Sequence, residues 1–124
     1  MRRVGIRILL VDDDQSLRAI IAMGLRLREH IVEEAADGAE AEAIFSKAVE
    51  EGPAVDQVIT DLVMPGIDGI ELVKRIKAKS QETPVCVVSG TLTPACRILI
   101  ERAGGGPALE KPFTLDKLCL ALNI

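Results

Sequence analysis

Short apolar runs in this chain alternate with longer stretches in which apolar residues recur every three or four positions. A short continuous apolar run is typical of a buried strand, and the three-to-four spacing is typical of an amphipathic helix. The pattern predicts strands near 7–11, 31–36, 55–60, 85–88 and 107–110. It predicts helices near 15–28, 37–50, 69–79, 93–103 and 114–122, each of which follows one strand.

This alternation of strand and helix predicts an α/β fold, a doubly wound five-stranded parallel sheet with five helices on both faces. Hydrophobic residues make up 48% of the sequence and aromatic residues only 2%, so the core must be packed mainly from Val, Ile, Leu and Ala. That composition suits a sheet that is buried on both faces. Glu33 and Glu34 interrupt the second strand, which we therefore expect at an edge. We expect residues 1–124 to form one domain.

The helical stripes also predict which side chains face inward. In the last two helices we expect Ile98 and Leu120 to lie off the inward stripes. Asp68 and Thr114 precede helices as capping residues, because their side-chain oxygens can accept hydrogen bonds from free backbone N–H groups. The inward set of the fourth helix is Cys96, Leu99, Ile100 and Ala103, and that of the fifth is Leu115, Leu118, Cys119 and Leu122.

Charge and composition argue against several classes of function. The net charge is −4 and the 15 basic residues form no stripe, so we expect no direct nucleic-acid binding. The apolar run that follows Arg7 is too short for a secretory signal or a membrane span. Three cysteines without metal-ligand spacing are read as reduced thiols, which indicates a cytoplasmic protein: Cys86, Cys96 and Cys119.

Polar residues stand where three of the predicted strands end. Asp12 and Asp13 follow the first strand, Asp61 follows the third, and Ser89 follows the fourth. In an open parallel sheet the carboxyl ends of the strands meet at one edge, where ligands bind. Three carboxylates there would repel one another, and a hard cation such as Mg²⁺ would relieve the repulsion. Lys111 follows the fifth strand at the same edge and can pair with an acid or a phosphate.

Each of these residues has a simpler explanation when it is taken alone. An Asp after a strand is commonly a helix cap or a turn former, and we expect Asp14 to be a solvated or capping residue. The lone His30 is read as a solvated loop residue on the opposite edge of the sheet. Ser89 therefore has no nearby general base, which argues against a Ser-His hydrolase.

Together, the three carboxylates, the Ser89 hydroxyl and the Lys111 ammonium suit phosphoryl transfer to a carboxylate. An aspartyl phosphate is a recognised covalent intermediate. Neither of the Gly-rich nucleotide-binding motifs, GxxxxGK[ST] and GxGxxG, occurs in the sequence. The phosphoryl donor is therefore expected to be another molecule.

Four segments together resemble the receiver domain of two-component response regulators. They are LVDDD at 10–14, TDLVMPGIDG at 60–69, VSG at 88–90 and KPF at 111–113, in the order of that family. The resemblance covers essentially the whole chain. It implies a flavodoxin-like sheet of order 2-1-3-4-5 and a phosphorylation-dependent signalling switch, not an enzyme that acts on a separate substrate.

The resemblance also implies a role for each matching residue. Asp61 matches the phosphoacceptor and a Mg²⁺ ligand. Asp13 matches a direct Mg²⁺ ligand, Asp12 one that acts more often through water, and the backbone carbonyl of Val63 a further ligand. Ser89 matches the hydroxyl that turns toward the phosphoryl group.

The last matching residue, Lys111, corresponds to the lysine that contacts a phosphoryl oxygen. The donor implied is a phosphohistidine on a sensor histidine kinase or a histidine phosphotransfer protein. Output would use the face of the fourth helix, fifth strand and fifth helix, where Ile98 and Leu120 lie, in a monomer or a phosphorylation-dependent dimer.

One position departs from the family pattern. The family commonly carries Tyr or Phe three residues before the lysine, and this chain has Ala108 there. A methyl group cannot fill or vacate a pocket of ring size. We therefore expect phosphorylation to shift the backbone around Gly90–Thr93 more than anything on the fifth strand.

Two other readings stay open at this point. A Mg²⁺-dependent phosphatase with an Asp nucleophile would usually need a second acid two residues later and a cap region. Val63 holds that position, and the chain is short for a cap. A degenerate receiver that serves only for docking is the third reading, although the chemical residues are all present.

Overall fold

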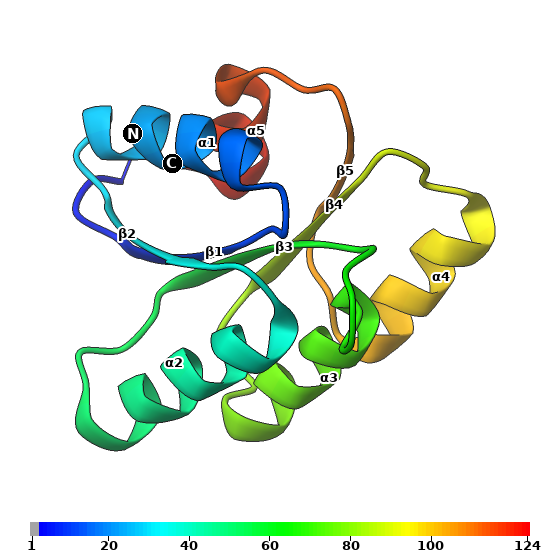
Figure 1. Ribbon diagram of the computed structural model, residues 1–124, viewed down its shortest axis with the longest axis horizontal. Helices are drawn as coiled ribbons and strands as arrows, with labels where there is room; N and C mark the ends of the chain where they lie inside the picture. The colour runs from blue at the N-terminus through cyan, green and yellow to red at the C-terminus, as the bar shows by residue number, and fades with distance from the viewer. Residues whose placement is uncertain (1–2) are drawn as a thin grey trace.

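One parallel sheet forms the centre of the molecule, as described by a computed structural model for residues 3–124. Its strand order is β2-β1-β3-β4-β5, which confirms the predicted order and places β2 at an edge (Figure 1). All neighbouring strands run parallel. The strands are β1 Arg7–Val11, β2 Ile31–Ala35, β3 Gln57–Asp61, β4 Val85–Ser89 and β5 Ala108–Glu110.

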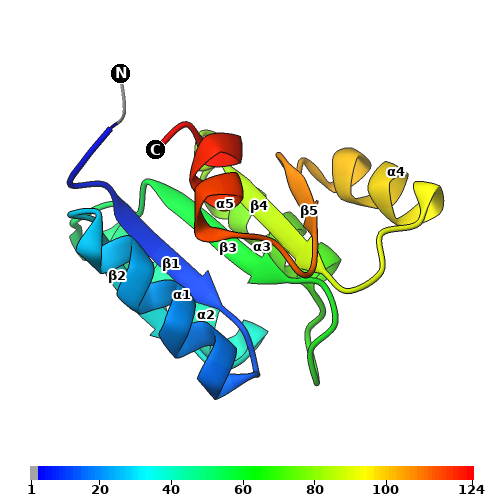
Figure 2. The same cartoon turned by 90° about the horizontal axis from the view of Figure 1, so that it is seen from above.

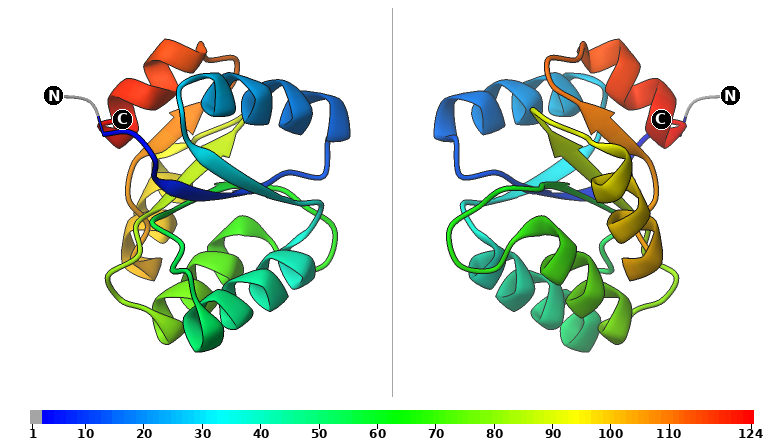
Figure 3. Two further views of the ribbon diagram at one scale, coloured as in Figure 1. Left: turned by 90° about the vertical axis from the view of Figure 1, so that its left-hand side faces the viewer. Right: turned by 90° about the vertical axis from the view of Figure 1, so that its right-hand side faces the viewer.

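Five helices lie in two layers, with α1 and α5 on one face of the sheet and α2, α3 and α4 on the other (Figure 3). The predicted ranges agree with the structure to within two residues. The longest helix has 14 residues, and no described helix is long and apolar enough to cross a bilayer. The helices are α1 Gln15–Leu27, α2 Gly38–Glu51, α3 Gly69–Lys79, α4 Pro94–Ala103 and α5 Leu115–Leu122.

The sheet separates two apolar clusters, because successive side chains of a strand point to opposite faces. In β1, Leu9 and Val11 belong to the cluster under α2 and α3, whereas Ile8 and Leu10 belong to the cluster under α1 and α5. All four side chains are fully buried. Phe45 is the only fully buried aromatic side chain among the described residues, so aliphatic packing carries the core as the composition predicts.

Each helix begins after a residue whose side-chain oxygen accepts a hydrogen bond from a backbone N–H in the first turn. Asp14, predicted as a solvated or capping residue, accepts from the N–H of Leu17, and Asp68 accepts from the N–H of Glu71. Such caps fix the point at which each strand-to-helix loop ends. The complete set of capping residues is Asp14, Asp37, Asp68, Thr93 and Thr114.

The prediction that His30 is solvated was wrong. The turn after α1 passes through Glu29 at a φ of 69°, and His30 then lies buried with 5% exposure. Neither ring nitrogen has a hydrogen-bond partner among the described residues. Burial, with the nearby charges of Arg3 and Arg28, lowers the pKa of His30 and favours the neutral ring.

The predicted inward stripe of α4 was also wrong at one position. Ile100 is buried, but Leu99 is 50% exposed, as is its neighbour Ile98. Consecutive helix residues point about 100° apart, so a helix that covers the edge of a sheet buries a narrower stripe than one over its centre. Ile98 and Leu120 lie off the inward stripes as predicted, with Leu120 84% exposed.

Gly69 at the start of α3 packs directly against the end of β3. A Cβ atom at this position would lie 2.4 Å from the carbonyl oxygen of Asp61 and 2.8 Å from the Cα atom of Leu62. Both neighbours are backbone atoms, and the N–H of Gly69 also donates to the carbonyl of Leu62 at 2.8 Å. The loop cannot accept a side chain here without movement of β3.

We therefore expect Gly69→Ala to lower the free energy of unfolding by about 1–3 kcal/mol, the range typical of an overpacked site. Urea denaturation followed by circular dichroism measures the change. Gly90→Ala is the matched control, because nothing lies within 4 Å of a Cβ at Gly90 and its φ lies outside the left-handed region, as does that of Gly69. Equal losses for both variants would contradict the proposed clash.

Candidate functional site

The carboxyl ends of β1, β3, β4 and β5 open at the same edge of the sheet (Figure 2). The register pairs Val11 of β1 with Thr60 of β3, and Asp61 with Val88 of β4. It also pairs Ser89 with Glu110 of β5. The polar residues that end these strands are therefore brought to one edge, as the sequence predicts.

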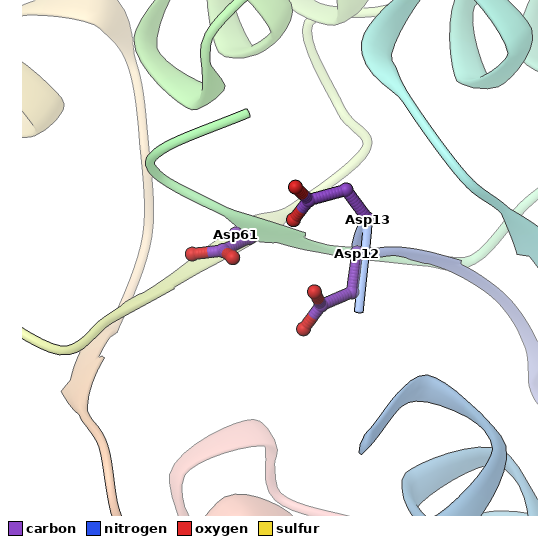
Figure 4. A group of neighbouring side chains, drawn as sticks. All are labelled: Asp12, Asp13 and Asp61. Carbon is purple, nitrogen blue, oxygen red and sulfur yellow. The ribbon is translucent and has the colours of Figure 1, made fainter. Parts of the chain in front are cut away.

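Three carboxylates meet at this edge (Figure 4). Asp12, Asp13 and Asp61 each offer an oxygen, and these oxygens lie within 4.8 Å of one another. Asp12 is 1% exposed and Asp61 is 8% exposed, whereas Asp13 is open to solvent. Among residues 3–124 this is the one group of three acidic, His or Cys side chains placed closely enough to hold a metal ion.

Lys111 reaches into the acidic group. Its Nζ atom lies 3.2 Å from Oδ2 of Asp61 and 3.4 Å from Oδ2 of Asp12. Burial by itself would lower the pKa of Lys111, but the charges of Asp61 and Asp12 outweigh burial and raise it. The side chain is therefore a fixed positive charge beside both buried carboxylates.

The environment of Asp61 disfavours its negative charge. Burial raises the pKa of Asp61, the charge of Asp12 raises it further, and Lys111 offsets only part of the shift. A cation between the carboxylates would reverse this balance, because it would favour the ionised form of each.

Asp12 and Asp13 differ in the contacts that they make. Oδ1 of Asp12 accepts a hydrogen bond from the N–H of Asp14 at 2.9 Å, and Oδ2 faces Lys111. The carboxylate of Asp13 accepts no hydrogen bond from any residue in the described part of the chain, so both of its oxygens are open to a ligand. Hard oxygen donors of this kind fit Mg²⁺.

The Ser89 hydroxyl lies at the same edge but is engaged by its own loop. It accepts from the N–H of Thr91 at 3.2 Å and donates to the carbonyl of Thr91 at 3.1 Å. Ser89 and Asp61 form no hydrogen bond with each other among the interactions of residues 3–124. In this structure the hydroxyl therefore contacts its own loop and not Asp61.

Three contacts near the site were not predicted from the sequence. Arg18 donates to the backbone carbonyl of Asp12 at 2.7 Å and forms an ion pair with Glu34 of β2 at 3.1 Å. Glu110 accepts a hydrogen bond from the N–H of Leu92 at 3.3 Å. The contacts of Arg18 with Glu34 and of Leu92 with Glu110 join residues that are 16 and 18 positions apart, and no local sequence pattern specifies them.

Comparison with known proteins identifies the family. The profile of the response regulator receiver domain matches residues 8–123. The chain belongs to the response regulator receiver family. PrrA of Mycobacterium tuberculosis, a transcriptional regulatory protein, is 38% identical over 112 residues, which are 90% of this chain and 46% of PrrA. TcrA of the same organism, also a transcriptional regulatory protein, is 37% identical over 119 residues, or 96% of this chain and 45% of TcrA.

Solved receiver structures share the fold. The chemotaxis protein CheY4 of Vibrio cholerae superposes with a TM-score of 0.87 and 31% identity, covering 96% of this chain and 97% of that one. The receiver domain of the hybrid histidine kinase CckA superposes with a TM-score of 0.74 and 35% identity, covering 94% of both chains. The receiver described here spans a little under half the length of PrrA and TcrA. Its family membership implies phosphorylation-dependent signalling in a two-component system.

Proposed function

We propose that this receiver accepts a phosphoryl group on Asp61 from a phosphohistidine and thereby changes the partners that it binds. The observation that carries the proposal is the contact of Lys111 with both Asp61 and Asp12 inside a group of three carboxylates. A fixed ammonium beside one buried carboxylate is placed to stabilise charge on a transferring phosphoryl group.

Mg²⁺ would be held by Asp13, Asp12 and Asp61, with the backbone carbonyl of Val63 as a further ligand. Support comes from the oxygen donors within 4.8 Å of one another and from the unpaired carboxylate of Asp13. When it is bound, Mg²⁺ neutralises charge on phosphoryl oxygens. Lys111 holds a second positive charge at the same place.

In the proposed step an Oδ atom of Asp61 attacks phosphorus while the bond between phosphorus and the donor imidazole nitrogen breaks. The imidazole leaves with the electron pair of that bond, and an acyl phosphate remains on Asp61. Ser89 then gives up its bonds to Thr91 and donates its hydroxyl hydrogen to a phosphoryl oxygen. This rotation links the chemistry to the β4–α4 loop.

A phosphatase that turns over a separate substrate is less well supported. Such an enzyme would usually carry a second acid two residues after its nucleophile, where this chain has Val63 with a side chain 72% exposed. No further carboxylate joins the three-residue group among residues 3–124. The proposed chemistry is therefore the receiver's own phosphorylation and loss of phosphate.

An apolar groove of about 420 Å³ lies between α1 and the start of α5, and Lys111 is part of its lining. On its α1 side, Ile20, Met23 and Leu27 are 60–79% exposed. Because the groove adjoins the residue that touches Asp61, it is where we place the phosphodonor, a histidine kinase or phosphotransfer protein that presents an apolar surface.

For output we propose the face formed by α4, β5 and α5. Its exposed apolar side chains are Ile98, Leu99 and Leu120. Ile98 and Leu99 are neighbours on α4 and Leu120 is on α5, and exposed apolar side chains of this kind can mark a protein contact. The partner is an output protein or a second phosphorylated copy of the receiver.

Incubation with acetyl phosphate and Mg²⁺, followed by intact mass measurement, tests the proposed function. We expect a gain of one phosphoryl unit that depends on Mg²⁺ and is lost at alkaline pH, since acyl phosphates hydrolyse readily. No gain under any Mg²⁺ concentration, with the protein folded, would contradict the proposal.

A further inference from the structure

Two side chains hold the loop that joins β4 to α4. The Ser89 hydroxyl bonds both the N–H and the carbonyl of Thr91. One residue further on, the N–H of Leu92 donates to the Glu110 carboxylate at 3.3 Å. Two residues therefore hold the resting shape of the loop. Ser89 takes part in the proposed reaction, and Glu110 does not.

Glu110 acts from a rigid support. It is the last residue of β5, and the next residue, Lys111, donates its backbone N–H to the carbonyl of Ser89 at 2.7 Å. The end of β5 is thus fixed to the end of β4. Leu92 itself is 8% exposed and belongs to the apolar cluster under α2 and α3, so its backbone cannot shift without loss of packing.

Rotation of Ser89 toward Asp61 breaks both bonds to Thr91. The backbone at Thr91 is then released, but Leu92 is still held by its bond to Glu110 and by its packing, and both oppose movement of the loop. The bond is long and Glu110 is exposed, so it is worth about as much as an ordinary hydrogen bond, and its loss is still a measurable cost of switching.

We propose that Glu110 is a positioning residue that holds the β4–α4 loop, and through it Ser89, in the resting arrangement. The inference rests on the proposed phosphorylation of Asp61. Ala108 lies on the same face of β5 as Glu110 and offers only a methyl group. Glu110, and not an aromatic ring, is the side chain of β5 that couples this strand to the loop.

Affinity for a phosphoryl mimic tests the proposal, because mimic binding includes the cost of loop rearrangement. Beryllium fluoride, a tetrahedral stand-in for a phosphoryl group, is titrated at saturating Mg²⁺. We expect Glu110→Ala to lower the apparent Kd about fivefold, in line with one lost hydrogen bond. Glu110→Gln keeps an acceptor oxygen and stays closer to wild type.

We call the hydrogen bond from Leu92 to Glu110 the latch. Two controls separate its effect on binding of beryllium fluoride from the effects of lost charge or altered Mg²⁺ binding. Glu101→Ala removes the same charge from α4, where the side chain makes no hydrogen bond or ion pair within residues 3–124, and its Kd stays unchanged. Mg²⁺ affinity without beryllium fluoride also stays unchanged in Glu110→Ala. A merely structural role would lower stability and mimic affinity together, whereas the latch predicts lower stability with tighter binding.

A double-mutant cycle tests whether Glu110 acts on binding of the mimic through Ser89. Ser89→Ala has no hydroxyl to rotate, so adding Glu110→Ala to it should leave the apparent Kd unchanged. Amide hydrogen exchange at Leu92 in the metal-free protein provides an independent measurement, with faster exchange expected in Glu110→Ala than in Glu110→Gln.

The outcomes are distinct. An unchanged or higher Kd in Glu110→Ala, or the same gain in the Ser89→Ala background, would overturn the latch while leaving phosphorylation of Asp61 intact. If wild type binds no beryllium fluoride at saturating Mg²⁺, the proposed phosphorylation of Asp61 is contradicted. The proposed role of Glu110 is then contradicted too, because it rests on that phosphorylation.

Discussion

Asp61→Asn is expected to abolish phosphorylation by acetyl phosphate completely, while wild type gains one phosphoryl unit. An amide oxygen cannot form the acyl phosphate, and the neighbouring Asp12 is held by Lys111 and the N–H of Asp14. Intact mass measurement at saturating Mg²⁺ reads out the difference. The same gain in the variant would place the phosphoryl group elsewhere and remove Asp61 from its proposed role.

The same substitution should raise the free energy of unfolding by about 1 kcal/mol at neutral pH, because it removes one of three crowded carboxylates. The pKa of Asp61 is raised in the folded protein, mainly by burial, so the folded protein binds this proton more tightly than the unfolded chain does. The stability difference from wild type should therefore shrink as the pH falls through the folded-state pKa. A variant less stable than wild type at neutral pH would contradict this account.

Asp13→Asn is expected to weaken Mg²⁺ binding roughly 100-fold, because it removes a charged ligand that has no competing partner in the described structure. Mg²⁺ that binds only the folded state stabilises it by RT ln(1 + c/Kd), where c is the free Mg²⁺ concentration, so in the variant the rise in Tm should largely disappear over the Mg²⁺ range that stabilises wild type. Thermal denaturation over a Mg²⁺ titration measures the effect.

Asp14→Asn is the matched control for that experiment. It makes the same change of charge at the next residue, and asparagine caps a helix about as well as aspartate. Asp14 caps α1 and is not part of the carboxylate group. Equal losses of Mg²⁺ affinity in the two variants would indicate general electrostatics and not a ligand at Asp13.

Much of the fold follows from local rules that the sequence displays. Strand and helix boundaries were predictable because short apolar runs and capping residues such as Asp68 and Thr114 are local signals. The edge position of β2 followed from its two glutamates, and is confirmed. The convergence of Asp12 and Asp61 followed from the geometry of parallel sheets.

The features that sequence reasoning missed depend on packing between distant segments. His30 is buried by the turn after α1, in which its N–H donates to the carbonyl of Leu25, and no local pattern specifies this turn. Leu99 is exposed because α4 covers an edge of the sheet. The hydroxyl orientation of Ser89 and the contact of Glu110 depend on a loop shape that residue types alone do not fix.

The central claim is that folding places Asp61 to accept phosphorus, and one measurement locates the modified residue directly. After incubation with acetyl phosphate and Mg²⁺, borohydride reduces an acyl phosphate on aspartate to homoserine, and peptide sequencing by mass spectrometry identifies its position. We predict homoserine at position 61 and aspartate at positions 12 and 13. Homoserine at position 12 or 13, or at none of the three in protein that has gained a phosphoryl unit, would contradict the account.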